Sequence, residues 1–336
     1  AQLSHWGAYL AEVDGNEVVA VEPHPLDRDP SPLLGNIPGS TTSPARITRP
    51  AIRKGWLENG PGATAKRGVD PFVEVEWDRA LDILSAELDR VSTTHVNQAI
   101  FGGSYGWASA GRFHHAQSHL KRFLNLLGGF TSSVYSYSLG ASHVIVPRVL
   151  GNLNPFQFAT NWNQIIEHAE LVVAFGGLPV KNTFVSPGGV TEHPMRANMH
   201  AANDNGTRFV SISPLQDDLA EVPSEWIPTR PGSDVAVMLG LAHTLVIESL
   251  HDRAFLDTYT TGYDTFERYL LGESDGVPKT ASWAEAISGV PAARIQTLAR
   301  DMAAKRTLVT VGWALQRARY GEQPVWMGIT LAAMLG

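Results

Sequence analysis

The spacing of apolar and polar residues divides the chain into a β-rich start and a long stretch in which strands and helices alternate. Residues 8–22 alternate in polarity on both sides of an Asp-Gly-Asn triplet, which predicts a β-hairpin closed by a tight turn. Residues 23–71 are rich in Pro, Gly, Ser and Arg, and this composition predicts a long ordered loop. From Trp77 the apolar residues recur at spacings of three and four, which predicts a helix.

Short apolar segments then alternate with longer amphipathic segments. The expected strands, each followed closely by Gly or Pro, cover residues 98–101, 171–175, 209–212 and 308–311. The expected helices cover residues 112–127, 191–203, 234–249 and 291–304. Such alternation is typical of parallel sheets covered on both faces. We therefore expect an α/β fold, with parallel sheets flanked by helices in two α/β domains and a small β-rich N-terminal lead-in.

These elements suggest a division into three parts. We expect a β-rich N-terminal segment at 1–60, an incomplete first α/β domain at 61–155, and a second, dinucleotide-binding-like α/β domain at 156–336. Ligands of such folds bind beyond the carboxyl ends of the strands. The loops that follow the expected strands are therefore the places to look for chemistry.

Composition narrows the classes of function. The formal charge of -7 is spread without any Lys/Arg run, which argues against nucleic acid as a partner. No apolar run approaches the roughly 18 residues of a membrane span, so no span is expected. Cysteine is absent, which excludes disulfides, thiol nucleophiles, thiolate-bound zinc and cysteine-bound iron–sulfur clusters in this chain. Any metal must use oxygen or nitrogen ligands, or ligands that a cofactor brings.

One segment is compatible with a serine hydrolase. Residues 102–106, GGSYG, match G-x-S-x-G between an expected strand and an expected helix, the context that exposes a nucleophilic serine. Ser104 would then need an acid and a histidine, and Asp234 with His243 or His251 is available without any spacing that selects them. The alternative is a glycine turn that lets the backbone approach a ligand or a neighbour closely.

Polar residues beside apolar segments leave further alternatives open. In the stretch VYSYSLGASH (134–143), Ser136 and Ser138 flank Tyr137 and precede an apolar run, as in a helix cap or a binding loop. Lys181 follows two glycines and is either a surface lysine or a charge-stabilising group. Trp313, Gln316 and Arg317 follow the last expected strand, as a polar helix start or as a pocket for an anion or polar substrate.

Taken together, several segments resemble the molybdenum oxidoreductases of the dimethyl sulfoxide reductase group, and above all its S- and N-oxide reductases. The resemblance covers essentially the whole chain in the same order. It rests on HWGA (5–8), RPAIRKGWL (49–57), WDRALD (77–82), GGSYGW (102–107), GRFHH (111–115), LNLLGGF (124–130), SDVAVMLGLAHTLV (233–246), LLGESDGVPKTASWA (270–284), GWALQR (312–317), GEQ (321–323) and WMGITLAAMLG (326–336).

The resemblance implies a set of catalytic residues. Ser138 lies at the position of the serine that binds molybdenum in the family, where a hard, high-valent metal would hold it as an alkoxide. Tyr105 and Trp107 are implied to lie over the metal, with the phenol able to hydrogen-bond the oxygen that is transferred. Ser104 would then be part of the scaffold.

It also implies residues that bind the cofactor, among them Trp107. Lys181 matches a lysine between two pterins, where a cation can tune the electron distribution. Asp234 matches an aspartate that accepts hydrogen bonds from a guanine. Trp313, Gln316 and Arg317 match a helix start that lines the cofactor and the substrate.

The implied activity is removal of an oxygen atom from an S-oxide or N-oxide. The implied cofactor is molybdenum bis(molybdopterin guanine dinucleotide), without an iron–sulfur cluster, and the implied partners are the small-molecule oxide and an electron-donor protein or reductant. The compartment is left open between periplasm and cytoplasm, with the periplasm favoured.

The chain departs from the family pattern in two residues and in length. Leu139 replaces a Thr, and Ser213 replaces an Asp at a strand end, which weakens the expectation of nucleotide binding through that loop. Family members continue past the LAAMLG segment into further α/β structure and a C-terminal β-barrel that holds the cofactors. We expect this C-terminal portion to be missing here. An inactive cofactor-binding fragment is therefore a further alternative.

Overall fold

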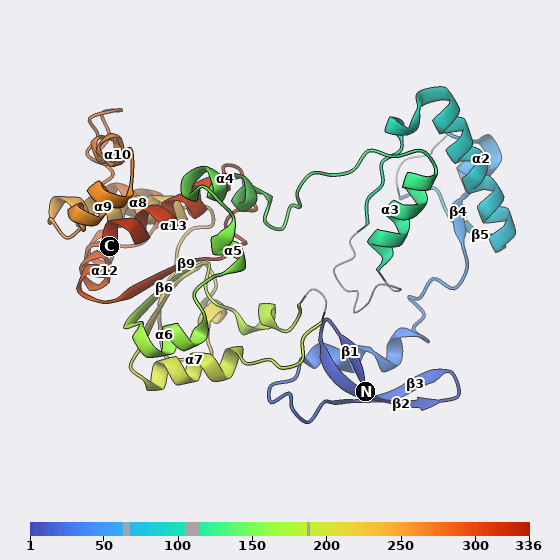
Figure 1. Cartoon of the computed structure of the whole chain (residues 1–336), viewed down its shortest axis with the longest axis horizontal. Helices are drawn as coiled ribbons and strands as arrows, with labels where there is room; N and C mark the ends of the chain where they lie inside the picture. The colour runs from blue at the N-terminus through green and yellow to red at the C-terminus, as the bar shows by residue number, and fades with distance from the viewer. Residues whose placement is uncertain (63–67, 105–114, 187–188) are drawn as a thin grey trace. The chain divides into compact units, whose positions relative to one another are not determined.

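The computed structural model describes residues 1–62, 68–104, 115–186 and 189–336, and these form two compact units. Unit 1 comprises Ala1–Val134 and Phe184–His193, and unit 2 comprises Tyr135–Thr183 and Pro194–Gly336. These boundaries differ from the three-part division expected from the sequence, and Ser138 lies in unit 2. Figure 1 shows the elements of both units.

Unit 1 begins with the predicted hairpin. Strands β2 (Gly7–Asp14) and β3 (Glu17–Pro23) pair antiparallel, and β1 (Gln2–Ser4) adds to the free edge of β2. Gly15 has φ 57° in the connecting turn, a backbone conformation that glycine adopts at no steric cost. The alternation of polarity over 8–22 therefore gave the correct prediction.

The segment expected as a loop at 23–71 contains regular structure. Strand β4 (Ala51–Arg53) pairs antiparallel with β5 (Phe72–Glu74), and helix α1 (Lys54–Asn59) follows β4. Two 3₁₀ helices precede them, η1 (Pro32–Asn36) and η2 (Pro38–Ser40). These elements are short, so their apolar positions are too few to show a period.

A buried polar pair joins the two stretches of chain that make up unit 1. His193 Nδ1 lies 2.7 Å from Asp27 Oδ2, and the backbone N–H of His193 donates to Asp27 Oδ1 at 3.1 Å. Both side chains are almost fully buried. Phe184 packs edge-on against the imidazole. The segment 184–193 is thus anchored on unit 1 by hydrogen bonds as well as by packing.

The expected strand at 98–101 is not formed. Residues Asn97–Ala99 form the 3₁₀ helix η3, and only Phe101 makes a bridge, with Thr131. The Asn97 side chain instead donates to the carbonyls of Leu127 and Gly129. This prediction was wrong because a short apolar run forms a strand only where a neighbouring strand can pair with it.

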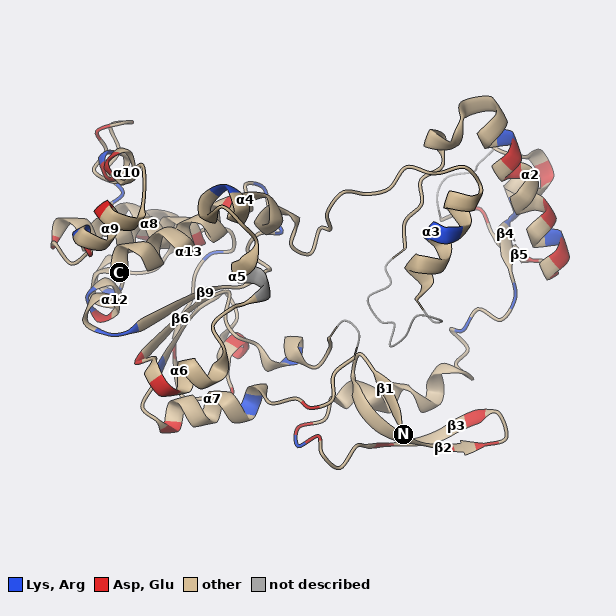
Figure 2. Cartoon of the chain, viewed as in Figure 1, with Lys and Arg blue, Asp and Glu red and all other residues tan. Residues whose placement is uncertain are grey.

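The two longer helices of unit 1 flank this region. Helix α2 (Trp77–His95) begins where the sequence predicted and has no buried residue, and α3 (Ala116–Leu126) buries Leu124. Figure 2 shows acidic and basic residues along α2. Most charged residues of α2 are exposed as expected, but apolar residues of this helix are exposed as well.

Unit 2 is built on a four-stranded parallel sheet in the order β8-β7-β6-β9. The strands are β6 (Leu171–Phe175), β7 (Arg208–Ile212), β8 (Ser224–Ile227) and β9 (Thr307–Val311). The central strand β6 agrees with the predicted range at both ends, and all of its residues are buried. The predicted parallel sheet is confirmed in this unit.

Helices cover both faces of this sheet (Figure 1). On one side lie α6 (Trp162–His168) and α7 (Met195–Asp204), and on the other lie α8 (Asp234–Ile247), α12 (Ala292–Ala304) and α13 (Glu322–Leu335). The remaining helices of unit 2 include α4 (Gly140–Leu150), α5 (Asn154–Gln157), α9 (Arg253–Tyr259), α10 (Tyr263–Leu270), α11 (Ala281–Ser288), and the 3₁₀ helices η5 (Val180–Thr183) and η6 (Gln216–Leu219).

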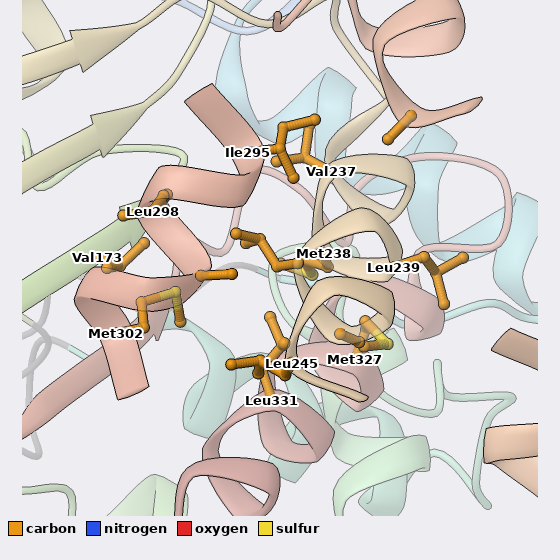
Figure 3. Packing of buried hydrophobic residues seen from close by; sticks show 14 of the residues in the cluster. Val173, Val237, Met238, Leu239, Leu245, Ile295, Leu298, Met302, Met327 and Leu331 are labelled. Atoms are coloured by element: carbon orange, nitrogen blue, oxygen red, sulfur yellow. The ribbon is translucent and has the colours of Figure 1, made fainter. Parts of the chain in front are cut away.

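The main hydrophobic core lies on the α8 side of the sheet. Figure 3 shows Val173 of β6 facing Leu298 and Met302 of α12, with Met238 and Leu245 of α8 beside them. Helix α8 carries a single charged residue, at its first position, and most of its side chains are buried. Within the described residues, no helix combines the length and the apolar character needed to cross a membrane.

Candidate active site at the carboxyl edge of the parallel sheet

The four parallel strands bring their following loops to one edge. Strand β6 is followed by Gly176, β7 by Ser213, β8 by the turn that leads to Asp234, and β9 by Gly312. The chain leaves β6 toward β7 on one side and returns as β9 on the other, so the strand order reverses beside β6. Ligands of open α/β sheets bind at such a reversal, outside the carboxyl ends of the strands.

Two consecutive glycines end β6 at this reversal. Gly176 and Gly177 have φ of 85° and 72°, in the left-handed region that side chains other than glycine rarely adopt. A Cβ on Gly176 would meet Leu315 Cδ1 at 2.5 Å, and one on Gly177 would meet Asp218 Cβ at 2.5 Å. The turn therefore requires glycine for its backbone conformation and for the close approach of the loops after β7 and β9.

Lys181 lies on the loop that these glycines begin. Its Nζ is 3.6 Å from Asp218 Oδ1, and the lysine side chain is 63% exposed while that of Asp218 is only 14% exposed. Ser213 donates its hydroxyl to Asp218 Oδ2 at 2.5 Å. The serine at the strand end thus holds a carboxylate from its own loop, and that carboxylate faces Lys181.

Asp234 is the first residue of α8 and is buried. Burial raises the pKa of the Asp234 carboxyl, because removing a carboxylate from water disfavours its ionised form. Ser233 precedes it at the N-cap, with its hydroxyl 2.9 Å from that of Thr229. A carboxyl held with a raised pKa is a common feature of functional sites.

Ser138 lines a cavity of about 700 Å³ in unit 2. Two stretches of chain form it, and the lining residues are Ser136, Tyr137, Ser138, Gly140, Ala141, Gln316, Arg317, Ala318 and Arg319. One stretch leads into α4, and the other follows β9. The two arginines of this lining make the walls positively charged.

Gln316 and Arg317 hold the backbone beside Ser138. Gln316 Nε2 donates to the Ser138 carbonyl at 2.6 Å, and Arg317 Nε donates to the same carbonyl at 3.2 Å. Trp313, in the same loop, is 50% exposed. The structure therefore brings together three of the residues singled out from the sequence, Ser138, Gln316 and Arg317.

The alternative of a helix cap for Ser138 is not what the structure shows. Helix α4 begins at Gly140, its N-cap position is Leu139, and no capping side chain comes from that position. Ser138 lies one residue before the cap and is part of the cavity lining. The sequence alone could not separate these two roles, because both place serine just before a helix.

Two of the expected catalytic residues, Tyr105 and Trp107, lie outside the described residues. Ser104 is described, and its carbonyl accepts from Gln117 Nε2 at 2.9 Å. The strand that a nucleophilic serine would require before it is replaced by η3 and a single bridge. Among the described residues the hydrolase alternative therefore lacks the structural context on which it depended.

Two residues at the site were not singled out from the sequence. Asp218 pairs with Lys181, and Arg319 lines the cavity. Both lie in loops that follow parallel strands, at 213–218 and 312–323, and their position there was the only available signal. No spacing along the sequence connects Asp218 with Lys181, because they follow different strands.

Comparison with protein families gives matches over nearly the whole chain. Residues 46–336 match the family described as molybdopterin oxidoreductase, and residues 2–41 match the molybdopterin oxidoreductase N-terminal domain. The two matches leave out only the first residue and a short stretch between them.

Curated relatives agree with this match. A dimethyl sulfoxide/trimethylamine N-oxide reductase of Cereibacter sphaeroides is 43% identical over 99% of the chain, which corresponds to 40% of the relative's length. A biotin sulfoxide reductase of the same organism is 42% identical over 95% of the chain and 43% of the relative. A trimethylamine-N-oxide reductase of Haemophilus influenzae is 40% identical, over 99% of the chain and 40% of the relative. The chain thus spans well under half the length of these relatives.

A solved structure shows the same fold at low identity. The acetylene hydratase from Pelobacter acetylenicus superposes with a TM-score of 0.61 at 18% identity, over 98% of this chain and 42% of that protein. At this identity the likeness concerns the fold alone.

Proposed function

The chain belongs to the molybdopterin oxidoreductase family, and from this we propose that the protein removes an oxygen atom from an S-oxide or N-oxide. The relatives named above are reductases of dimethyl sulfoxide, trimethylamine N-oxide and biotin sulfoxide, which supports this class of substrate. The net change would convert the oxide, two electrons and two protons into a sulfide or amine and water. An electron-donor protein or reductant would supply the electrons.

The observation that carries this proposal is the cavity beside Ser138. One of its walls is the loop after β9, a strand beside the reversal of strand order, and its lining includes Arg317, Arg319 and Ser138. A long anionic cofactor with phosphate groups fits a positively charged cavity of this kind. The described residues include no group of three His, Asp or Glu that could hold a metal ion by itself. A metal held mainly by sulfur atoms of its cofactor, with one serine oxygen, suits this donor set.

We assign roles to the residues of this chain on that basis. Ser138 would supply an oxygen ligand to molybdenum. Lys181 would place a positive charge beside the pterin, and Asp218 would restrain it. Trp313 and Arg317 would line the cofactor and the substrate path, and bound molybdopterin would supply the two-electron redox chemistry.

We also propose that the cofactor is the guanine dinucleotide form of molybdopterin. Asp234 lies at the carboxyl edge of the sheet, and its buried carboxyl could accept two hydrogen bonds from the edge of a guanine. Contact with these donors would favour the ionised form, which burial alone disfavours. Tyr105 and Trp107 are proposed, from the family resemblance, to bind the substrate oxygen. The chain has no cysteine, so we propose a site without an iron–sulfur cluster.

Metal analysis with a matched pair of variants tests the proposal. We expect the purified full-length protein to contain about one molybdenum and to reduce dimethyl sulfoxide or trimethylamine N-oxide. Ser138→Ala should retain the fold, change the metal absorption spectrum and lower turnover by on the order of 10²-fold, as loss of a group at a reacting centre does. Ser133→Ala, outside the cavity, should match the wild type.

Three results would contradict it. Unchanged turnover and an unchanged spectrum in Ser138→Ala would remove the ligand assignment. Absence of molybdenum, together with an esterase activity that Ser104→Ala abolishes, would favour the hydrolase. A metal-containing protein without turnover on any oxide would instead fit the inactive cofactor-binding alternative.

A further inference from the structure

The side chain of Gln316 is bonded to a single short stretch of backbone, residues 137–141. Its Nε2 donates to the carbonyls of Ser138 at 2.6 Å and Tyr137 at 3.4 Å, and its Oε1 accepts from the N–H of Ala141 at 3.0 Å. Gln316 is only 4% exposed. Both hydrogens of the amide and one acceptor site are therefore committed to the loop that carries Ser138.

One of these bonds caps helix α4. The first N–H groups of a helix have no acceptor within the helix, and a side-chain oxygen usually satisfies one of them. The N-cap residue here is Leu139, whose side chain offers no acceptor. Gln316 Oε1 takes this role for Ala141 from the loop after β9, far away in the sequence.

The other bonds fix the peptide that follows Ser138. The Ser138 carbonyl receives Gln316 Nε2 and Arg317 Nε, so both of its acceptor directions are used. The bonds to the carbonyls of Tyr137 and Ser138 fix the backbone on both sides of the Ser138 Cα. The direction of the Cα–Cβ bond, from which the hydroxyl extends, is thereby fixed.

Gln316 is itself held in place by a close backbone approach. Gly321 passes so near Gln316 that a Cβ on the glycine would lie 1.9 Å from the Gln316 carbonyl oxygen. Gly321 has φ -63°, so the glycine is needed here for space and not for backbone conformation. The loop 312–321 therefore folds back on itself behind the Gln316 side chain.

We propose that Gln316 is a positioning residue that holds Ser138 in the orientation required of a metal ligand, and that it does not bind the cofactor directly. This inference rests on the proposed function. Both donor hydrogens of its amide and one of its two acceptor sites are already used by residues 137–141. An oxygen ligand to a metal must be held close to its productive geometry, which is what such supporting hydrogen bonds provide.

Three variants of the full-length protein distinguish the effect of the bond to the Ala141 N–H from that of the bonds to the carbonyls of Tyr137 and Ser138. Gln316→Leu removes all of them, whereas Gln316→Glu keeps an acceptor for the Ala141 N–H and loses both donors. Gln323→Leu makes the same change at an exposed position of α13 and is the control. The readouts are amide hydrogen exchange at Ala141 in metal-free protein, and the Mo(V) resonance spectrum and molybdenum content of metal-loaded protein.

We expect exchange at Ala141 to be on the order of tenfold faster in Gln316→Leu, and unchanged in Gln316→Glu and Gln323→Leu. We expect both Gln316 variants to retain molybdenum and to show a broadened or second Mo(V) signal, because the ligand is no longer held in one orientation. Gln323→Leu should keep the wild-type signal.

Each contrary outcome has a distinct meaning. Wild-type exchange at Ala141 in Gln316→Leu, or a wild-type Mo(V) signal in both Gln316 variants, would overturn the positioning role. Loss of molybdenum from Gln316→Glu, with normal exchange at Ala141, would show that Gln316 binds the cofactor directly, and would also overturn it. A wild-type protein without molybdenum would instead contradict the proposed function, and faster exchange at Ala141 would then give Gln316 a structural role only.

Discussion

The two units of the chain bury their apolar residues very differently. In unit 2, every residue of β6 is buried, and α8 buries most of its length. In unit 1, α2 buries none of its residues, and its Trp77, Leu81 and Leu84 are more than half exposed. Both helices show clear apolar positions in the sequence, so the difference lies in what surrounds them.

The difference follows from how far neighbouring elements cover the apolar side of each helix. Helix α8 packs against α11, α12 and α13, which with the sheet close a core around it. The apolar side of α2 faces an open groove of about 500 Å³, lined mainly by apolar residues of α1, β4 and α2 itself. A helix gains most of its stability from packing of its apolar face, so α2 should be only weakly stable as described.

Hydrogen exchange should show the largest effect. We expect the central amides of α8 and β6 to exchange only through global unfolding, and those of α2 to exchange through local opening. Because a domain is stable by roughly 5–15 kcal/mol, this difference corresponds to on the order of 10³-fold or more in protection. Exchange of this chain, resolved to single segments, measures it. Equal protection in α2 and α8 would show that the open groove is covered.

A matched pair of leucine truncations should show the next largest effect. Leu241 in α8 is fully buried, and Leu84 in α2 is 53% exposed. We expect Leu241→Ala to lower the free energy of unfolding by about 3 kcal/mol, because it leaves a cavity in a packed core. Leu84→Ala should cost less than about 0.5 kcal/mol. Urea denaturation measures both, and a comparable loss at Leu84 would contradict the contrast.

The buried polar pair of unit 1 gives a third, smaller effect. His193→Ala leaves the buried Asp27 carboxylate without its imidazole partner, which we expect to cost about 2 kcal/mol. His168→Ala in unit 2 removes an exposed imidazole and should stay within about 0.5 kcal/mol. Thermal unfolding of the two variants against wild type checks this. Equal stability of both variants would mean that the pair contributes little to unit 1.

The same contrast explains which elements the sequence could predict. Strand β6 was predicted to the residue because a strand buried on both faces is a continuous apolar run ended by glycine. Residues 98–101 have a similar run and form no strand, because pairing depends on a neighbour that the local sequence does not specify. Helix α2 was predicted correctly from its period, but its period did not reveal whether the apolar face would be covered.

Some features of the candidate site could likewise be predicted from the sequence, and others could not. The loops after the parallel strands could be predicted, because topology alone puts carboxyl ends at one edge. Ser138 could be singled out by resemblance, but the role of Gln316 could not, because its bonds span the distance from the α4 loop to the β9 loop. Asp27 and His193 were missed for the same reason, since neither belongs to a local motif.

The smallest expected effect is a gain in stability at the site. Burial raises the pKa of Asp234 above the ordinary value of an aspartate, so folding disfavours its ionised form. The stability that this group contributes is fully present below the ordinary pKa and is lost as the pH rises through the raised value. At neutral pH the ionised carboxylate therefore costs stability. Asp234→Asn should raise the free energy of unfolding by less than about 1 kcal/mol there, the size of single stabilising changes.

The pH dependence distinguishes this cause from a general effect of the amide. Below the ordinary pKa of an aspartate, the wild-type carboxyl is protonated in both states, so the advantage of Asp234→Asn should disappear. Asp89→Asn changes an exposed carboxylate on α2 and should give no comparable gain at any pH. Unfolding midpoints of the three proteins from about pH 3 to 7 test this. A pH-independent gain in Asp234→Asn would show that the carboxyl is not destabilised by burial. A gain confined to neutral pH would indicate that the site keeps a costly buried carboxylate, as expected where binding outweighs stability.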